Sequence, residues 1–161
     1  MRPALLLAML LAACTGPYMS DLIRQPALPG YPVADMTYLM FEPAQGFRVE
    51  YLGQDGRAYL WAPGAGRVVP GVWRLEDRYQ IKNVEPLRQA AMLVCLRFGA
   101  RAGAVLGPGE WECRPRKRVA DEAVAGLAGD QFGLARNPVP PFPLARCRPP
   151  GAFTLLREAG C

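Results

Sequence analysis

The sequence predicts a mainly β fold: an antiparallel meander that forms a small barrel or sandwich, with one short helix near the C-terminal part. Two observations predict this class. Short segments in which apolar and polar residues alternate follow one another between residues 47 and 98. Glycine- and proline-rich stretches of the kind that form tight turns separate them. The chain of 161 residues suits one domain with a hydrophobic core better than two.

The first half of the chain predicts a series of hairpins. Residues 53–56 form a glycine-bounded turn between two alternating segments, and residues 63–66 form a second turn. The apolar segment 36–41 is compatible with either a strand or a short helix. In chain order we expect these segments to be 36–41, 47–51, 57–62, 67–76 and 78–84.

The second half predicts a strand pair, a helix and an extended tail. Residues 91–98 are almost wholly apolar, as in a strand flanked on both sides, and residues 110–114 return after a glycine-rich loop. Residues 119–128 fit a helix, since acidic residues suit its first turn and Gly129 its end. The proline-rich stretch 137–150 predicts an extended strap, which the last disulfide could fasten to the domain.

The N-terminus has the layout of an export signal, with Arg2 followed by an apolar run over 4–13. Ten apolar residues are too few to span a bilayer. The end of the run resembles the lipobox of bacterial lipoproteins, with Leu11, Ala12, Ala13 and Cys14 in order. The resemblance implies cleavage after Ala13 and acylation of Cys14. Thr15 then favours the outer membrane, because an aspartate at that position tends to retain such proteins at the inner membrane.

These expectations divide the chain into four parts. The mature chain would lose Arg2, which leaves 18 basic and 14 acidic residues and a net charge of +4, against +5 for the whole chain. In order, the parts are a signal peptide over 1–13, a lipidated tether over 14–35, a β-rich domain over 36–136 and a proline-rich C-terminal strap over 137–161.

Four cysteines remain once Cys14 is acylated, an even number in a chain exported to an oxidising compartment. Three pairings are possible. We expect Cys95 with Cys113, because both lie in neighbouring strand segments, and Cys147 with Cys161, because both lie in the tail. No metal site and no cofactor is expected, since the sequence has no CxxC pair and no histidine.

Catalytic residues are scarce. Ser20 is the one serine and there is no histidine to activate a nucleophile, so serine and cysteine hydrolases are excluded. Glu110 and Glu112 would lie on one side of a strand, roughly 7 Å apart. Such a pair suits glycoside hydrolysis, but we favour the interpretation in which Trp111 and Cys113 face the core and the glutamates face solvent.

The densest basic cluster consists of Arg114, Arg116, Lys117 and Arg118. It could bind anionic headgroups, peptidoglycan carboxylates or an acidic protein surface, although a solvated loop is the simpler interpretation. No aromatic residue stands among these cations, so no nucleic-acid partner is expected.

Three aromatic residues, Tyr59, Trp61 and Trp73, fall in adjacent expected strands and could form a binding face, although we favour the core for them. Gly71, Val72 and Trp73 resemble the Gly-x-Trp motif of lipocalin-like barrels, here in the middle of the chain and not near the first strand. The order of a β-meander, a Gly-x-Trp motif and a pair of cysteines is also similar to that in small β-rich envelope lipoproteins.

We therefore expect a lipid-anchored protein of the cell envelope, held at the outer membrane, facing the periplasm and acting as a non-catalytic binding or structural module. Its partners would be the membrane, through the lipid on Cys14, and an envelope protein or peptidoglycan. Two other functions stay open. One is an inhibitor of an envelope-attacking enzyme such as lysozyme, although lysozymes are usually basic and would be repelled by a basic protein. The other is a cell-wall glycosidase that uses Glu110 and Glu112.

Overall fold

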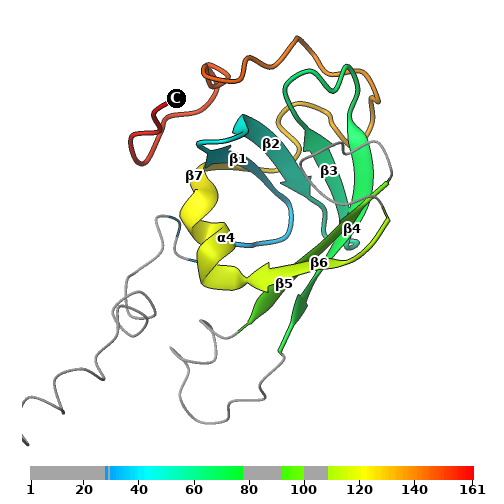
Figure 1. The fold of residues 1–161 in the computed structure, drawn as a ribbon. Helices are drawn as coiled ribbons and strands as arrows, with labels where there is room; N and C mark the ends of the chain where they lie inside the picture. Colours follow the sequence, from blue (N-terminus) through cyan, green and yellow to red (C-terminus); the bar gives the residue numbers. More distant parts are fainter. Residues whose placement is uncertain (1–27, 29, 78–91, 100–108) are drawn as a thin grey trace, which may run out of the picture.

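The structure is a computed structural model that describes residues 28, 30–77, 92–99 and 109–161. Within these residues, seven strands form one antiparallel sheet that curls into a half-barrel (Figure 1). The order across the sheet is β6-β5-β4-β3-β2-β1-β7. In chain order the strands are β1 Met36–Glu42, β2 Gly46–Leu52, β3 Arg57–Trp61, β4 Val69–Glu76, β5 Leu93–Phe98, β6 Glu112–Pro115 and β7 Ala123–Ala128. The predicted antiparallel meander is confirmed.

The helix of the described part, α4 (Arg116–Glu122), joins the two edges of the sheet. Strand β6 at one edge ends at Pro115, and β7 at the other edge begins at Ala123 (Figure 1). The helix buries Val119 and Ala120 in the same apolar cluster as the inner side chains of the sheet. It therefore closes the open side of the half-barrel with apolar contacts.

The inner face of the sheet forms the first core. Side chains on it are contributed by every strand of the meander from β1 to β5, because alternate residues of a strand point to the same side. The members of this cluster that are at least 98% buried are Tyr31, Tyr38, Met40, Leu52, Ala58, Leu60, Val69, Val94, Phe98, Val119, Ala120 and Ala123. Tyr31 lies in the segment expected to be a tether over 14–35, so the end of that segment is part of the barrel interior.

The outer face of β7, β1, β2 and β3 forms a second core beneath the C-terminal tail. Trp61 is 1% exposed and packs against Phe132 and Phe142, with ring centroids 5.3 and 4.9 Å away. Leu144 and Phe153 of the tail pack in the same cluster. Both faces of this half of the sheet are thus buried.

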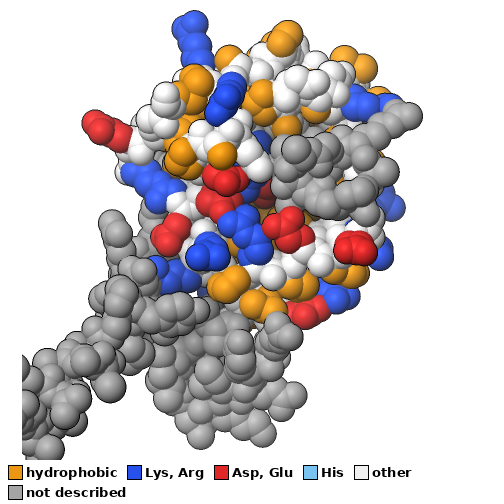
Figure 2. Space-filling view, in the orientation of Figure 1, with side chains coloured by type: hydrophobic (Ala, Val, Ile, Leu, Met, Phe, Trp, Pro, Cys, Tyr) orange, Lys and Arg blue, Asp and Glu red, His pale blue; other side chains and the backbone are white. Residues whose placement is uncertain are grey.

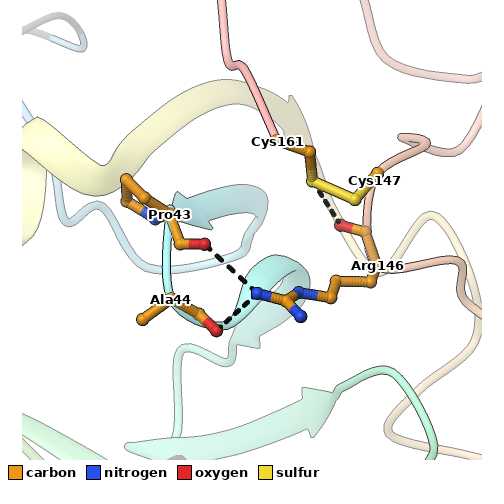
Figure 3. Close-up of a disulfide and its surroundings, with 5 residues drawn as sticks. All are labelled: Pro43, Ala44, Arg146, Cys147 and Cys161. Atoms are coloured by element: carbon orange, nitrogen blue, oxygen red, sulfur yellow. Dashed lines mark hydrogen bonds between the residues drawn. A yellow bond between two sulfur atoms is a disulfide. The ribbon is translucent and has the colours of Figure 1, made fainter.

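The tail is held on the barrel by hydrogen bonds at several points, of which Arg146 makes the most, and not by a disulfide. The Val68 backbone N–H donates to the Pro138 carbonyl oxygen, and the Leu156 backbone N–H donates to the Val124 carbonyl oxygen. The Phe47 backbone N–H donates to the Arg146 carbonyl oxygen at 2.8 Å. The Arg146 guanidinium donates to the Ala44 carbonyl oxygen at 2.8 Å (Figure 3). Gly46 is required between them, because its φ is +82° and a Cβ there would lie 2.3 Å from the Arg146 carbonyl oxygen. The expectation that the last disulfide fastens the tail to the domain is wrong, because that bond joins the tail to itself.

The helix expected over 119–128 is also wrong in its position. The helix covers Arg116–Glu122, and Ala123–Ala128 is strand β7. The cause is that β7 is apolar on both faces: Ala123 packs in the inner core, whereas Val124 and Ala125 pack in the outer one. A strand buried on both sides shows no alternation and can imitate the apolar side of a helix.

Two other expectations concern the remaining strands. The segment 36–41, for which the sequence allowed either a strand or a short helix, belongs to strand β1. The expected strand over 78–84 lies outside the described residues.

In the part of the chain that the structure describes, no helix combines the length and the apolar character needed to cross a membrane.

Candidate functional site

Charged side chains enter the apolar interior of the half-barrel from β2. Arg48 and Glu50 alternate with outward residues and point to the inner face, where they are 5% and 1% exposed. The Arg48 Nε donates to Glu50 Oε1 at 2.9 Å. Burying a charge is unfavourable unless it is paired, so each of these residues requires the other.

Helix α4 and strand β6 complete the charged group. Glu122, the last residue of α4, accepts from Arg48 Nη2 at 2.7 Å and also pairs with the Arg114 guanidinium. Arg114 lies 4.0 Å from Glu112 on the same strand. We call these five residues the charged mouth: Arg48, Glu50, Glu112, Arg114 and Glu122.

The charged mouth runs from solvent into the core. Glu112, Arg114 and Glu122 are 38%, 29% and 14% exposed at their side chains. Arg48 and Glu50 follow at 7% and 1%. Figure 2 shows acidic and basic side chains gathered together in the middle of the face it presents.

The two outer carboxylates of the charged mouth differ electrostatically. Burial of Glu122 opposes its charge, but hydrogen bonds from Arg114 and Arg48 outweigh burial and lower its pKa. At Glu112, burial is the dominant influence and raises the pKa, although the nearby Arg114 acts in the opposite direction. The carboxylate of Glu122 is therefore held ionised, whereas ionisation of Glu112 is made less favourable.

Two buried polar atoms beside the charged mouth have no hydrogen-bond partner among the described residues: the Tyr31 hydroxyl and Glu50 Oε2. Burial, and then the charge of Glu50, raise the pKa of Tyr31 well above its usual value. The phenol therefore stays protonated. The other carboxylate oxygen of Glu50 is neutralised by Arg48, an arrangement that suits a structural ion pair better than a proton-transferring acid or base.

The structure does not support Glu110 and Glu112 as a pair. Glu110 is exposed and precedes β6, whereas Glu112 belongs to the charged mouth. The expectation that Trp111 and Cys113 face the core is wrong, because Glu112 and Arg114 are the inward residues. The register explains this: Glu112 and Arg114 lie opposite Leu96 and Val94, which are inner-core residues.

The basic cluster expected at 114–118 is divided among several environments. Arg114 joins the charged mouth, and the Arg116 guanidinium donates to the Tyr31 carbonyl oxygen. Lys117 lies 3.6 Å from Asp121, one turn further along α4, and Arg118 is exposed. The four cations therefore do not share one surface, since a strand and a helix meet at Arg116.

The aromatic residues Tyr59, Trp61 and Trp73 do not share one face either. Tyr59 and Trp61 belong to the outer core, whereas Trp73 packs against the inner core and its indole N–H donates to the Gly53 carbonyl oxygen at 3.0 Å. Gly71 allows β4 and β5 to approach closely, because a Cβ there would lie 2.5 Å from the Arg97 carbonyl oxygen.

A second cluster lies on the outer face of β4, β5 and β6, which the C-terminal tail leaves uncovered. Trp111 has the guanidinium carbons of Arg74 and Arg97 at 4.0 and 4.9 Å from its ring centroid. Arg74 also pairs with Glu76. We call Arg74, Arg97 and Trp111 the arginine platform. This cluster could not be predicted from the sequence, since Arg74 lies on β4, Arg97 on β5 and Trp111 just before β6. The outward positions of Arg74 and Arg97 in alternating segments were the signal available.

The cysteines pair as expected. Disulfides join Cys95 to Cys113 and Cys147 to Cys161. Cys95 and Cys113 are directly opposite in the register of β5 and β6. Cys161 Sγ lies 3.8 Å from the carbonyl oxygen of Arg146, so the second disulfide abuts the attachment point of the tail (Figure 3).

The described residues contain one group of metal-ligating atoms, Glu76 with Cys95 and Cys113. Both sulfurs are committed to the disulfide, so they are not available as thiolate ligands.

Comparisons of the chain with protein-family models, with curated proteins and with solved structures found no match.

Proposed function

We propose that this protein is a lipid-anchored component of a bacterial cell envelope, in which Cys14 carries the lipid and the half-barrel is a non-catalytic binding module on the periplasmic side. The observation that supports this most strongly is the use of the cysteines. The sequence has five, and two disulfides account for four. Disulfides persist in oxidising compartments, and the fifth cysteine is the one that ends the lipobox.

The proposed anchor is physically sufficient. Each buried methylene of an acyl chain contributes about 0.8 kcal/mol, so one chain binds a membrane only marginally, and two or more are needed for stable attachment. A diacylglyceryl group on the Cys14 thiol supplies two chains. The outer membrane is the proposed location because Thr15 follows the cysteine.

The pairing of the buried charges argues against Glu50 and Glu122 as catalytic groups. Glu122 and Glu50 are both engaged by arginines, and Arg48 bridges them. A general acid or base needs a proton that it can exchange near neutral pH. The lowered pKa of Glu122 does not meet this requirement. Burial raises the pKa of Glu112, so Glu112 is the carboxylate of the charged mouth on which the test for catalysis depends.

Metabolic labelling with an alkyne analogue of palmitate tests the anchor. Bacteria that express the full chain should incorporate the label, and Cys14→Ser should abolish incorporation. Thr15→Ser is the matched control, since it changes the adjacent residue and keeps the thiol. Equal labelling of the Cys14→Ser chain, or no labelling of the wild-type chain, would contradict the proposal.

Incubation of the purified protein with isolated cell-wall sacculi tests the absence of catalysis. We expect no soluble fragments. Release of fragments that Glu110→Gln or Glu112→Gln abolishes would instead establish a glycosidase.

A further inference from the structure

The outer sheet face around β4 and β5 differs in chemistry from the half that the tail covers. Beneath the tail, the outer face presents Trp61, Phe47 and Val49. On β4 and β5 it presents Arg74 and Arg97, both exposed. Two exposed arginines thus stand on this half of the sheet, whereas the side chains on the other half are apolar and buried.

The arginine platform restrains its two guanidinium groups through contacts with the Trp111 ring. A guanidinium over an aromatic ring is attracted by the ring, and Trp is the strongest of the aromatic residues in this respect. Strands β4, β5 and β6 are hydrogen-bonded to one another, and the Cys95–Cys113 disulfide cross-links β5 to β6 beside Trp111. Little side-chain freedom is then left to lose when Arg74 and Arg97 bind an anion.

We propose that the arginine platform binds a glycan polymer that carries carboxylates, the chemistry of a bacterial cell wall. Arginine recognises carboxylates through paired N–H donors, and two guanidiniums near one ring can engage one carboxylate or two neighbouring ones. The assignment rests on the proposed envelope location, because that location brings the platform within reach of such a polymer.

A glycan fits this face better than a bilayer does. Proteins that lie on membranes insert apolar side chains between headgroups. Among the described residues, the exposed large apolar side chains are Val33, Leu75, Val139, Phe142 and Leu156, and none belongs to the outer face of β4 to β6. Two exposed arginines beside one aromatic ring, with no exposed large apolar side chain on this face among the described residues, therefore favour a polar polymer.

Glu76 competes with the proposed ligand. Its carboxylate pairs with Arg74 and occupies part of the donor set that an incoming carboxylate would use. Removing its charge should therefore strengthen binding, an effect that damage to the fold would not produce.

Cosedimentation of the full-length protein, purified in detergent, with isolated sacculi tests the proposal. We expect Arg74→Ala and Arg97→Ala each to weaken binding about tenfold, as for loss of a charge-assisted hydrogen bond. Trp111→Leu should weaken it about threefold. Glu76→Gln should strengthen it about twofold to threefold. Arg148→Ala, an exposed arginine of the tail, is the charge-matched control and should change binding less than about twofold.

Sacculi whose carboxylates have been converted to amides supply the chemical control, and they should lose most of the binding. Three results would overturn the proposal: no cosedimentation of the wild-type protein, equal effects of Arg148→Ala and Arg74→Ala, or unchanged binding to amidated sacculi. Platform-dependent binding to phosphatidylglycerol vesicles in place of sacculi would also overturn it and assign the face to lipid. Sacculus binding does not require acylation, so its failure is distinguishable from failure of the Cys14 labelling.

Discussion

Glu122 connects three elements of the half-barrel, so replacing it with glutamine should destabilise the fold measurably. It accepts hydrogen bonds from Arg48 on β2 and from Arg114 on β6. Glutamine fills the same volume and keeps one acceptor oxygen, but it loses the charge and places an amide group beside a guanidinium. We expect a loss of about 3 kcal/mol in the free energy of unfolding, from one to two charge-assisted hydrogen bonds at about 1.5–3 kcal/mol each.

Urea unfolding of the oxidised protein at pH 7 measures this loss. With an m-value of about 2 kcal/mol/M, the midpoint of Glu122→Gln should fall by about 1.5 M relative to wild type. Glu158→Gln, an exposed glutamate of the tail, is the matched control and should stay within about 0.5 kcal/mol of wild type.

The pH dependence of the free energy of unfolding is a second test of the role of Glu122. The pKa of Glu122 is lowered in the folded protein, so the stability it contributes is fully present above the unfolded carboxyl value of about 4.3 and is lost as the pH falls through the folded pKa. Wild type and Glu122→Gln should therefore converge in stability at acid pH. Equal midpoints at pH 7, or a difference that persists unchanged at pH 3, would refute the reasoning.

Three other substitutions test separate parts of the fold. Glu112→Gln should raise the thermal midpoint at pH 7, because burial raises the pKa of Glu112 and its charged form opposes folding. This gain in midpoint should vanish as the pH falls through the raised pKa of Glu112. A lower midpoint of the variant at pH 7 would contradict the sign of the effect. Gly46→Ala should cost at least about 1–2 kcal/mol in the free energy of unfolding and expose the tail around Arg146 to limited proteolysis, since it combines a positive φ with a clash against the Arg146 carbonyl. An unchanged cleavage rate near Arg146 would count against its hydrogen bonds as an attachment point of the tail. Trp61→Ala should lower the free energy of unfolding in urea by about 3–5 kcal/mol, and Phe142→Ala should lower it clearly less, because Phe142 is 44% exposed. A larger loss for Phe142→Ala than for Trp61→Ala would contradict the placement of Trp61 at the centre of the outer core.

Features governed by local chemistry could be predicted from the sequence. The turn at 53–56 joins β2 to β3, as the alternation on either side of it indicated. The pairing of Cys95 with Cys113 followed from two neighbouring segments that run antiparallel, and the register places the two residues opposite each other. These predictions depend on residues close in the chain or on one strand pair.

Features governed by distant contacts could not be predicted. Arg48 and Glu50 look like the solvent-facing residues of an alternating strand, yet they point inward, because the apolar alternate residues Phe47 and Val49 are buried beneath a tail about 100 residues further along the chain. The same tail covers the outer side of β7 and removes the alternation that would have identified Ala123–Ala128 as a strand. Without the position of the tail, polar residues between apolar ones are assigned to solvent.

The pairing of β1 with β7 constrains when the sheet can close. Met36 lies opposite Ala128, so β1 pairs with a strand segment 92 residues later in the chain. Contacts between residues so far apart in the sequence slow folding, since the entropy cost of closing the long intervening loop precedes the stabilisation by those contacts. A chain that crosses a membrane from its N-terminus would therefore expose the β1 edge until residue 128 has emerged. During that interval β1 could pair with another chain, so the proposed export of this protein should be sensitive to chaperones that shield strand edges.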